Sequence, residues 1–301
     1  MASASGGSLP LASPAPRAAP PFAPRRRSTL WRRLGQSWQI RIGGTIVALL
    51  LLTVATAPYL AVADPAQPNV LARFAGPSRA HPFGTDNLGR DIFSQIVYGS
   101  RISLSIGLIS VGIAAAAGIT LGVLAGFYRR LDSPIMRVID VLLAFPGLLL
   151  AIAIIGALGP SLDNAMIAVG VGGVPQFVRI VRSAVFRVRA NEYVDAARAV
   201  GVRDARILAR YVLPNISSEI IVTATLGIAA AILVAAALSF LGLGAQPPTP
   251  EWGAMAFVAS SYLDVAPHQA FFPIGAIFVT ILGFNFLGDG LRDALDPRLH
   301  R

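Results

Sequence analysis

Four ionisable residues lie close together in the segment HPFGTDNLGRD, namely His81, Asp86, Arg90 and Asp91. Imidazole and carboxylate groups are the side chains that bind divalent metals and transfer protons. A metal site needs several ligands that converge on one point, and one histidine with two aspartates at these spacings indicates such a site only weakly. The alternative is an external loop held by turns and salt links, in contact with a partner protein. We expect the loop.

Other reaction chemistries are excluded by residue types that the chain lacks. It contains no cysteine, which rules out thiolate nucleophiles, thiolate metal sites and disulfides. It also contains no lysine, because all 25 basic residues are arginine. A P-loop uses a lysine to reach the nucleotide phosphates, so the chain is not expected to be such an ATPase itself. We predict that it is not an enzyme and that it holds no catalytic residue, metal or cofactor.

The composition indicates a membrane protein. The chain has 301 residues, of which 54% are hydrophobic and only 13% are charged, whereas about a quarter of the residues of a soluble domain are charged. A spanning helix needs roughly 20 mostly apolar residues. Six stretches meet or approach this length: 42–63, 102–128, 141–159, 163–178, 220–243 and 269–288. The sequence therefore predicts an all-α membrane protein with six transmembrane helices, of which the fourth is the weakest.

The arginines predict the orientation of these helices. If the N-terminus is cytoplasmic and all six segments span, only four arginines lie outside: Arg73, Arg79, Arg90 and Arg101. The other 21 of the 25 then lie in the cytoplasm, as the positive-inside rule requires. We expect both termini in the cytoplasm and attribute the net charge of +10 to topology rather than to nucleic-acid binding. A signal peptide cleaved near AVAD (61–64) is the alternative to an anchor, but the first apolar run is long for one.

The N-terminal 80 residues are expected to form two regions. Residues 1–28 are rich in proline, alanine and serine without an apolar period, so we predict a disordered cytoplasmic tail. Residues 29–80 would hold an elbow, the first span and the start of the external loop. In the elbow, LWRRLGQSW places Leu30, Leu34 and Trp38 on one side, which is typical of a short interfacial helix; a simple basic flank is the alternative.

A charged segment, NEYVDAARAVGVRDARILARYVLPN (191–215), interrupts the apolar sequence. Eight arginines between 179 and 210 would cost on the order of 20 kcal/mol in the bilayer, so the segment lies outside it. Its pattern predicts two short helices: Asn191 and Asp204 act as caps, Gly201 ends the first helix and Pro214 ends the second.

This hairpin would expose small side chains, namely Ala196, Ala197 and Ala199, with a few charges around them. Small side chains allow another backbone to come close, so the pattern favours a docking surface over a reaction site. An ordinary amphipathic surface hairpin is the alternative.

The same segment resembles the cytoplasmic signature loop of ABC importer permeases. The family's pattern is matched by six residues: Glu192, Ala196, Ala197, Gly201, Leu213 and Pro214. Four further segments, 81–107, 140–152, 238–253 and 284–298, are similar to the C-type permeases of dipeptide and oligopeptide importers, so the resemblance covers 81–301. Two positions differ from the residues that relatives in this family often carry. Tyr211 stands where a histidine is common, and Ala235 stands where a carboxylate is common.

The resemblance implies the type I ABC importer permease fold, with 81–301 as the permease core and 190–215 as the coupling loop. It implies that the loop contacts an ATPase through nine residues: Glu192, Tyr193, Asp195, Ala196, Ala197, Gly201, Asp204, Leu213 and Pro214. It also implies a peptide importer of the bacterial inner membrane. The partners would be a second permease, two ATPase subunits that bind the ATP, an external solute-binding protein and membrane lipid.

Several alternatives stay open. Permeases of this kind also serve glutathione, nickel complexes or other small solutes. A secondary transporter or channel would work without an ATPase, but it would carry charges in mid-span, where none is evident. Asn285 could line the pathway or form a helix–helix hydrogen bond, and Gly118 and Gly122 are spaced for close helix packing.

Overall fold

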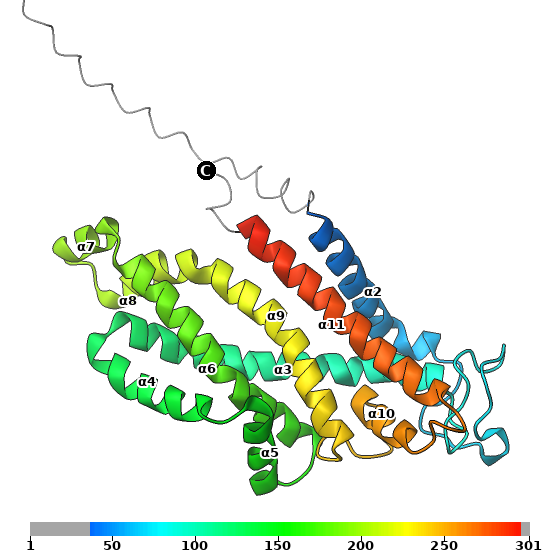
Figure 1. Ribbon diagram of the computed structural model, residues 1–301. Coiled ribbons are helices and arrows are strands. Elements are labelled where there is room, and N and C mark those ends of the chain that lie inside the picture. The colour runs from blue at the N-terminus through cyan, green and yellow to red at the C-terminus, as the bar shows by residue number, and fades with distance from the viewer. Residues whose placement is uncertain (1–36, 296–301) are drawn as a thin grey trace, which may run out of the picture.

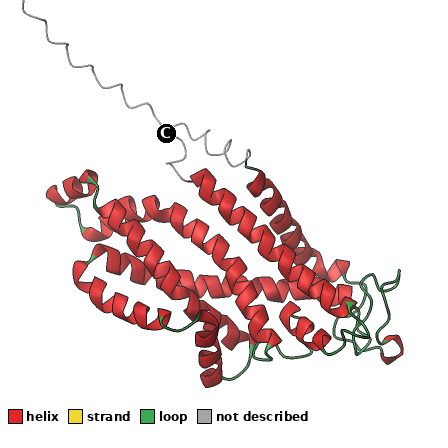
Figure 2. Cartoon of the chain, viewed as in Figure 1, coloured by secondary structure: helices red, strands yellow, loops and turns green. Residues whose placement is uncertain are grey.

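The computed structural model describes residues 37–295, and within them the chain is a bundle of helices (Figures 1 and 2). The elements run in the order α2 (Trp38–Leu60), η1 (Val70–Ala72), α3 (Ile92–Phe127), α4 (Arg129–Leu143), α5 (Gly147–Leu158), α6 (Leu162–Arg189), α7 (Glu192–Ala199), α8 (Asp204–Ile207), η2 (Leu208–Val212), α9 (Leu213–Phe240), α10 (Trp252–Ser260) and α11 (His268–Leu295). No strand forms in this part of the chain, apart from an isolated bridge between Thr85 and Asp91. The predicted disordered tail and most of the predicted interfacial helix lie outside the described residues.

Five of the six predicted spans are continuous helices. The helices α2, α3, α6, α9 and α11 are each long and apolar enough to cross a bilayer. The fourth prediction, which was the weakest, corresponds to α6, a helix of 28 residues that continues through Pro175. Pro175 and its neighbour Val174 are buried, and a bundle tolerates an internal proline where neighbouring helices enclose it. The predicted all-α membrane fold is confirmed.

The third predicted span, 141–159, is wrong as a continuous helix. The chain forms α4 and α5, which meet at a break of three residues and at an angle of 90°. Pro146 is the last residue of the break, and a proline restricts the preceding residue to extended backbone, so a helix usually stops there. The helix α4 starts earlier than predicted and carries Arg129 and Asp132 in its first turn. The sixth span exists only if this bent pair is counted as one.

The helices α3 and α6 touch along a seam of glycines. A Cβ atom at Gly122 would lie 2.8 Å from Cβ of Val181, and one at Gly126 would lie 2.7 Å from Cβ of Val185. Gly118 meets Phe177 in the same way one turn earlier. Small residues four apart therefore let the two backbones come close, which is how helices gain packing energy in a bilayer that offers no hydrophobic drive.

The helices α2 and α11 pack against each other at the edge of the bundle. Gly43 of α2 lies against the backbone of Leu287, and Gly283 of α11 lies against Ile46. The opposite face of α2 exposes large apolar side chains, including Leu49 and Leu52. Exposed leucine on a spanning helix contacts lipid without cost, so this face is suited to the bilayer.

The glycine seam gives a stability prediction. Substituting Gly122→Val is expected to lower the free energy of unfolding by about 1–3 kcal/mol, because the added atoms overlap Val181 on a rigid neighbouring helix. Gly112→Val is the matched control on α3, since Gly112 has nothing within 4 Å of an added Cβ. Thermal unfolding of the purified variants in one detergent measures the difference. Equal melting temperatures for the two variants would contradict the packing account.

Candidate functional site

The polar hairpin projects from one end of the bundle. Figure 1 shows α7 and α8 beyond the end of α6, and the loop that precedes α3 at the opposite end. The helix α7 spans Glu192–Ala199, and α8 begins at Asp204. Gly201 lies between them with φ of 78°, a left-handed conformation that glycine adopts without strain. The amide of Val202 donates to the carbonyl of Ala197 at 3.0 Å and closes the end of α7.

An apolar cluster holds the hairpin on the bundle. Val194 and Ala197 of α7 are buried together with Ile207, Val212 and Phe127, the last residue of α3. Residues three apart share a helix face, so one face of α7 is committed to this contact. Ala197 was expected to be exposed for docking, and the structure places it inward instead.

The ends of the two helices differ from the predictions. Asn191 is in the cap position of α7 but makes no capping bond, and its Nδ2 donates to the carbonyls of Arg187 and Val188 at 3.1 and 2.9 Å. It therefore completes the end of α6. Asp204 does not cap α8 either, because the cap position belongs to Arg203 and no side chain bonds there.

Pro214 does not end the second helix. The helix runs from Asp204 to Phe240 without a break, so the hairpin leads directly into a span. A π-helical turn at Leu208–Val212 precedes the proline. A proline lacks an amide hydrogen and collides with the carbonyl four residues earlier in a regular helix. The wider turn spaces the backbone differently at this point, so the helix continues. Sequence reasoning missed this because a π turn has no clear pattern.

The outward face of α7 carries exposed apolar groups. Tyr193, Ala196 and Val200 recur at helical spacing and are exposed, Val200 to 81%. Tyr193 lies beside Tyr211, with ring centroids 6.2 Å apart. Glu192 and Asp195 add negative charge to the first turn of α7, where the helix dipole favours it. Leu213 and Pro214 are exposed at the start of α9. We name Tyr193, Ala196, Val200 and Gly201 the hairpin face.

Three ion pairs tie α6 to its neighbours below the hairpin. Arg182 makes two bonds to Asp132 of α4, at 2.5 and 2.7 Å. Farther along, Arg179 bonds Asp140 of α4 at 2.8 Å, and Arg187 bonds Glu219 of α9 at 2.7 Å. Ion pairs between different helices fix the relative position of those helices. The hairpin is therefore attached to helices whose arrangement is held by ion pairs.

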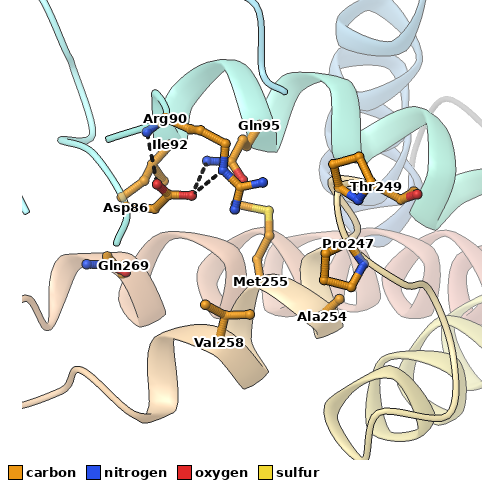
Figure 3. Close-up of a pocket in the computed structure, with 11 residues that line it drawn as sticks. Asp86, Arg90, Ile92, Gln95, Pro247, Thr249, Ala254, Met255, Val258 and Gln269 are labelled. Carbon is orange, nitrogen blue, oxygen red and sulfur yellow. Dashed lines mark hydrogen bonds and ion pairs between the residues drawn. The ribbon is translucent and has the colours of Figure 1, made fainter. Parts of the chain in front are cut away.

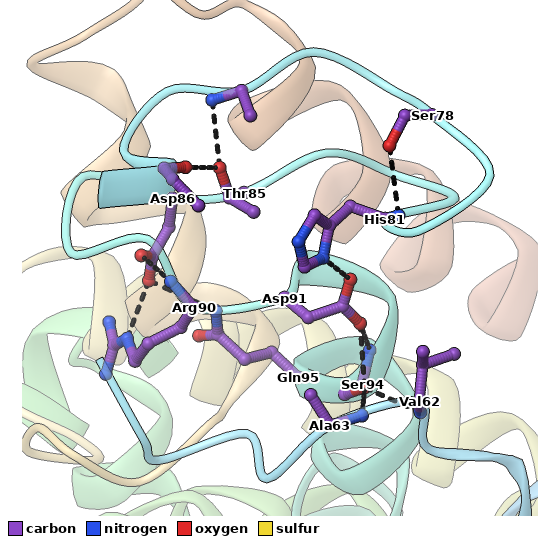
Figure 4. A network of polar contacts seen from close by, with 12 residues as sticks. Val62, Ala63, Ser78, His81, Thr85, Asp86, Arg90, Asp91, Ser94 and Gln95 are labelled. Carbon is purple, nitrogen blue, oxygen red and sulfur yellow. Dashed lines mark hydrogen bonds and ion pairs between the residues drawn. The ribbon is translucent and has the colours of Figure 1, made fainter. Parts of the chain in front are cut away.

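The loop residues that were predicted to be external form a closed network at the other end of the bundle (Figure 4). His81 Nδ1 lies 3.0 Å from Asp91 Oδ1, and the other oxygen of Asp91 accepts from the amide of Ser94 at 2.7 Å. Asp86 accepts from Arg90 Nε at 2.7 Å and from Gln95 Nε2 at 3.1 Å. The carboxylates are thus occupied by protein donors, as a structural loop requires. Among residues 37–295, no group of three potential ligands could hold a metal.

A small pocket adjoins this network (Figure 3). It has a volume of about 40 Å³ and is lined by Asp86, Arg90 and Gln95 on one side and by Met255 and Gln269 on the other. Sites that enclose a small molecule usually measure about 300–1,000 Å³. The pocket is therefore too small to enclose a peptide.

Glu251 is a buried carboxyl group that sequence reasoning missed. It is 1% exposed and accepts from the amides of Gly253 and Ala254 at 3.0 and 2.9 Å, so it caps α10. Ser103 of α3 donates to the same carboxylate at 3.4 Å. A glutamate just before a run of helix formers was the available signal. Its role is to join α10 to α3.

The remaining singled-out residues lie within the spans. Asn285 of α11 is half-buried and makes no hydrogen bond with another described residue. Ala235 is 2% exposed and packs in the apolar core. A carboxylate at position 235 would be buried at high cost unless it were paired. Gly118 and Gly122 lie in the seam between α3 and α6.

Two kinds of comparison relate the chain to known proteins. Residues 118–301 match the family described as binding-protein-dependent transport system inner membrane component. The dipeptide transport system permease protein DppC of Alkalihalophilus pseudofirmus is 46% identical over 295 residues, which cover 96% of this chain and 97% of that protein. The glutathione transport system permease protein GsiD of Pectobacterium atrosepticum is 48% identical over 271 residues, which cover 89% of this chain and 90% of that protein.

Solved structures share the fold. A chain of the inward-facing MetNI methionine ABC transporter superposes with a TM-score of 0.57 at 18% identity, covering 67% of this chain and 97% of that one. A chain of an amino acid ABC transporter with histidines gives a TM-score of 0.52 at 16% identity, covering 67% and 94%. The helices, the family match and the relatives agree: the chain belongs to the family of binding-protein-dependent transport system inner membrane components, and it is a permease subunit of an ABC importer.

Proposed function

We propose that the chain forms one half of the translocation pathway of a peptide importer and that its hairpin face docks on a separate ATPase subunit. The observation that carries the proposal is the hairpin itself. It stands clear of the spans at one end of the bundle, it exposes Tyr193 and Val200, and it continues without a break into α9. A displacement of the hairpin would therefore reach a membrane-spanning helix directly.

The ATP chemistry belongs to the partner in this proposal. The chain has no lysine for a P-loop, so a nucleotide bound by another subunit must act on it through contact. Two sites then share one equilibrium between outward-facing and inward-facing states, and nucleotide biases that equilibrium through the docked hairpin. The full transporter would hold a second permease, two ATPase subunits and an external solute-binding protein.

The substrate class is inferred from the relatives. One is named for dipeptides and another for glutathione, and both compounds contain amide-linked amino acids. We propose short peptides as the cargo, with nickel complexes or other small solutes as the alternative. Selection is assigned to the solute-binding protein, because the pocket beside Arg90 is too small to enclose a peptide.

A secondary transporter is disfavoured by where the charges lie. Such proteins place ionisable groups and broken helices near the middle of the bilayer. The break between α4 and α5 is the one feature of the described residues that resembles the broken helices of a secondary transporter. Apart from Asp163 in the first turn of α6, the charged side chains of α6 and α9 lie toward the hairpin end. Several of them are paired there, as with Arg187 and Glu219. Coupling through an ATPase accounts for both the hairpin and this distribution.

Docking is tested by placing a charge on the hairpin face. Val200→Asp is expected to weaken binding of the ATPase about 30-fold, because a desolvated carboxylate in an apolar contact costs about 2 kcal/mol. Leu71→Asp is the matched control, since Leu71 is fully exposed at the other end of the molecule. The measurement is copurification of the ATPase and its dissociation constant for the reconstituted permease pair. Equal affinities for the two variants would disprove the docking role.

Orientation is tested with single cysteines, which the cysteine-free chain allows. With the hairpin in the cytoplasm, Arg203→Cys is expected to react with a membrane-impermeant maleimide only in inside-out vesicles. Arg79→Cys, in the loop before α3, is expected to react only in intact spheroplasts. The reverse pattern would invert the proposed topology.

The cargo is tested by competition in proteoliposomes that contain the complete transporter and its solute-binding protein. Uptake of a labelled dipeptide is expected to need ATP and to fall in the presence of excess unlabelled dipeptide. Glutathione and a nickel complex are the competing cargoes in parallel assays. Uptake of only the nickel complex would overturn the peptide assignment while leaving the docking proposal intact.

A further inference from the structure

A second feature of the hairpin end is an open hollow with a basic wall, which we name the arginine hollow. Its volume is about 310 Å³, and it lies where α7 faces the end of α6 and the start of α4. It is lined by Arg129, Phe186, Arg189, Ala190, Asp195 and Arg198. Three guanidinium groups and one carboxylate therefore share one concave surface.

The arginines of this hollow differ from those below it. On α6, Arg179, Arg182 and Arg187 each bond a carboxylate of the same chain at 2.8 Å or less. Those charges are compensated internally, and they hold helices together. The positive charge that the positive-inside rule places on this end is thus neutralised over much of α6 but not in the hollow.

The three hollow arginines lack such partners. Arg129 is exposed and makes no hydrogen bond or ion pair with another described residue. Arg189 donates to the carbonyl of Phe127 at 2.9 Å, which holds its side chain without neutralising it. Arg198 lies 3.6 Å from Asp195, longer than the 2.7–2.9 Å typical of a charge-assisted hydrogen bond. The hollow therefore keeps two net positive charges with guanidinium edges free to bind.

Two of the three arginine side chains of the hollow are held in place by the end of α3. Arg198 lies over the ring of Phe127, 5.2 Å from its centroid, and Arg189 is held by the end of α3. Little side-chain entropy remains to be lost there when an anion binds. Guanidinium groups recognise carboxylates through paired parallel hydrogen bonds.

We propose that the arginine hollow receives an aspartate or glutamate side chain of the ATPase subunit that docks on the hairpin face. This inference rests on the proposed docking function. Val200 directly follows α7, a helix of only eight residues, and Asp195 and Arg198 lie on another side of that helix. A protein that encloses this short helix contacts both the hairpin face and the wall of the hollow. Asp195 repels a doubly charged phosphate monoester more than a singly charged carboxylate, which disfavours free phosphate in the hollow. A lipid phosphodiester carries one charge, so the choice of lipid in the test distinguishes it from a protein side chain.

The contact would link two parts of the permease. Arg198 belongs to α7 and Arg129 to the first turn of α4, which leads to the break before α5. One carboxylate bound between them would join the hairpin to the broken span as well as to α9. The ATPase would then hold two helices of the permease at one point.

The test uses the complete transporter in nanodiscs and compares two neighbouring arginines. Arg129→Gln and Arg198→Gln are expected to weaken ATPase binding about fivefold at low salt and to flatten its salt dependence, since one screened ion pair is lost. Arg130→Gln is the matched control, because Arg130 is the adjacent exposed arginine and does not line the hollow. It is expected to change the affinity by less than about twofold.

A chemical rescue removes the risk of a mere structural effect. Arg129→Cys is expected to bind weakly and to regain affinity with 2-aminoethyl methanethiosulfonate, which restores a cation. The anionic 2-sulfonatoethyl reagent is expected not to restore it. The cysteine-free parent chain serves as the reagent control.

The outcomes separate this inference from the docking proposal. If Val200→Asp abolishes binding while Arg129→Gln matches Arg130→Gln, the arginine hollow has no acidic partner and only this inference fails. If Val200→Asp has no effect, docking itself fails. An effect of Arg129→Gln that occurs with phosphatidylglycerol and vanishes in phosphatidylcholine nanodiscs would assign the hollow to a lipid headgroup and overturn the inference.

Discussion

The close approach of α3 and α6 is the contact on which the rest of the permease depends. It requires glycine at positions 118, 122 and 126, because the Cβ atom of any larger residue there would overlap a side chain of α6. The approach also fixes Phe127, the last residue of α3, beneath Val194 of α7. In a bilayer there is no hydrophobic gain from bringing helices together, so tight backbone contact must supply the association. The position of the hairpin is thus set by packing that begins several turns away.

Ion pairs also help to fix the position of the hairpin. Within α6, arginines reach sideways to Asp132 and Asp140 of α4 and to Glu219 of α9. Each is a modest contribution for an exposed pair, since such pairs are worth about 0–1 kcal/mol. Together they fix the position of α6 relative to its neighbours, because two of them join α6 to α4 and the third joins it to α9. Arg129 and Arg189, beside α7, have no carboxylate partner among the described residues, which leaves positive charge where the proposed partner protein would sit.

Much of this could be predicted from the sequence, and the failures have physical reasons. Apolar length and the arginine pattern located the spans because burial in lipid is decided by composition over some 20 residues. The break before α5 was missed because Pro146 lies inside an apolar run that satisfies the same length criterion. The continuation through Pro214 was missed because the turn that accommodates it leaves no mark in composition.

Exposure within the hairpin was harder to predict. Ala196 and Ala197 are neighbours with the same side chain, yet one is exposed and the other buried. Their difference depends on the orientation of α7 relative to Phe127, which is a tertiary contact. The arginine hollow could not be predicted from the sequence for the same reason, because Arg129 and Arg198 are far apart in the chain and are brought together by tertiary contacts. A pattern can indicate a docking segment but cannot say which of its side chains face the partner.

The geometry also constrains how a movement at one end can reach the other. The helix α3 has 36 residues, a length of about 54 Å, and it runs from the Asp91–Ser94 network to Phe127 under the hairpin. Bound to α6 along the glycine seam, it behaves as a rigid strut. A shift of the hairpin must then be taken up where the chain is not helical or not continuous. The break between α4 and α5 is such a point, and α4 is tied to α6 through Asp132. Rotation of the strut would therefore move α4 with it and change the angle between α4 and α5. Under the proposed coupling, this bend is where a movement of the hairpin would become a change within the membrane.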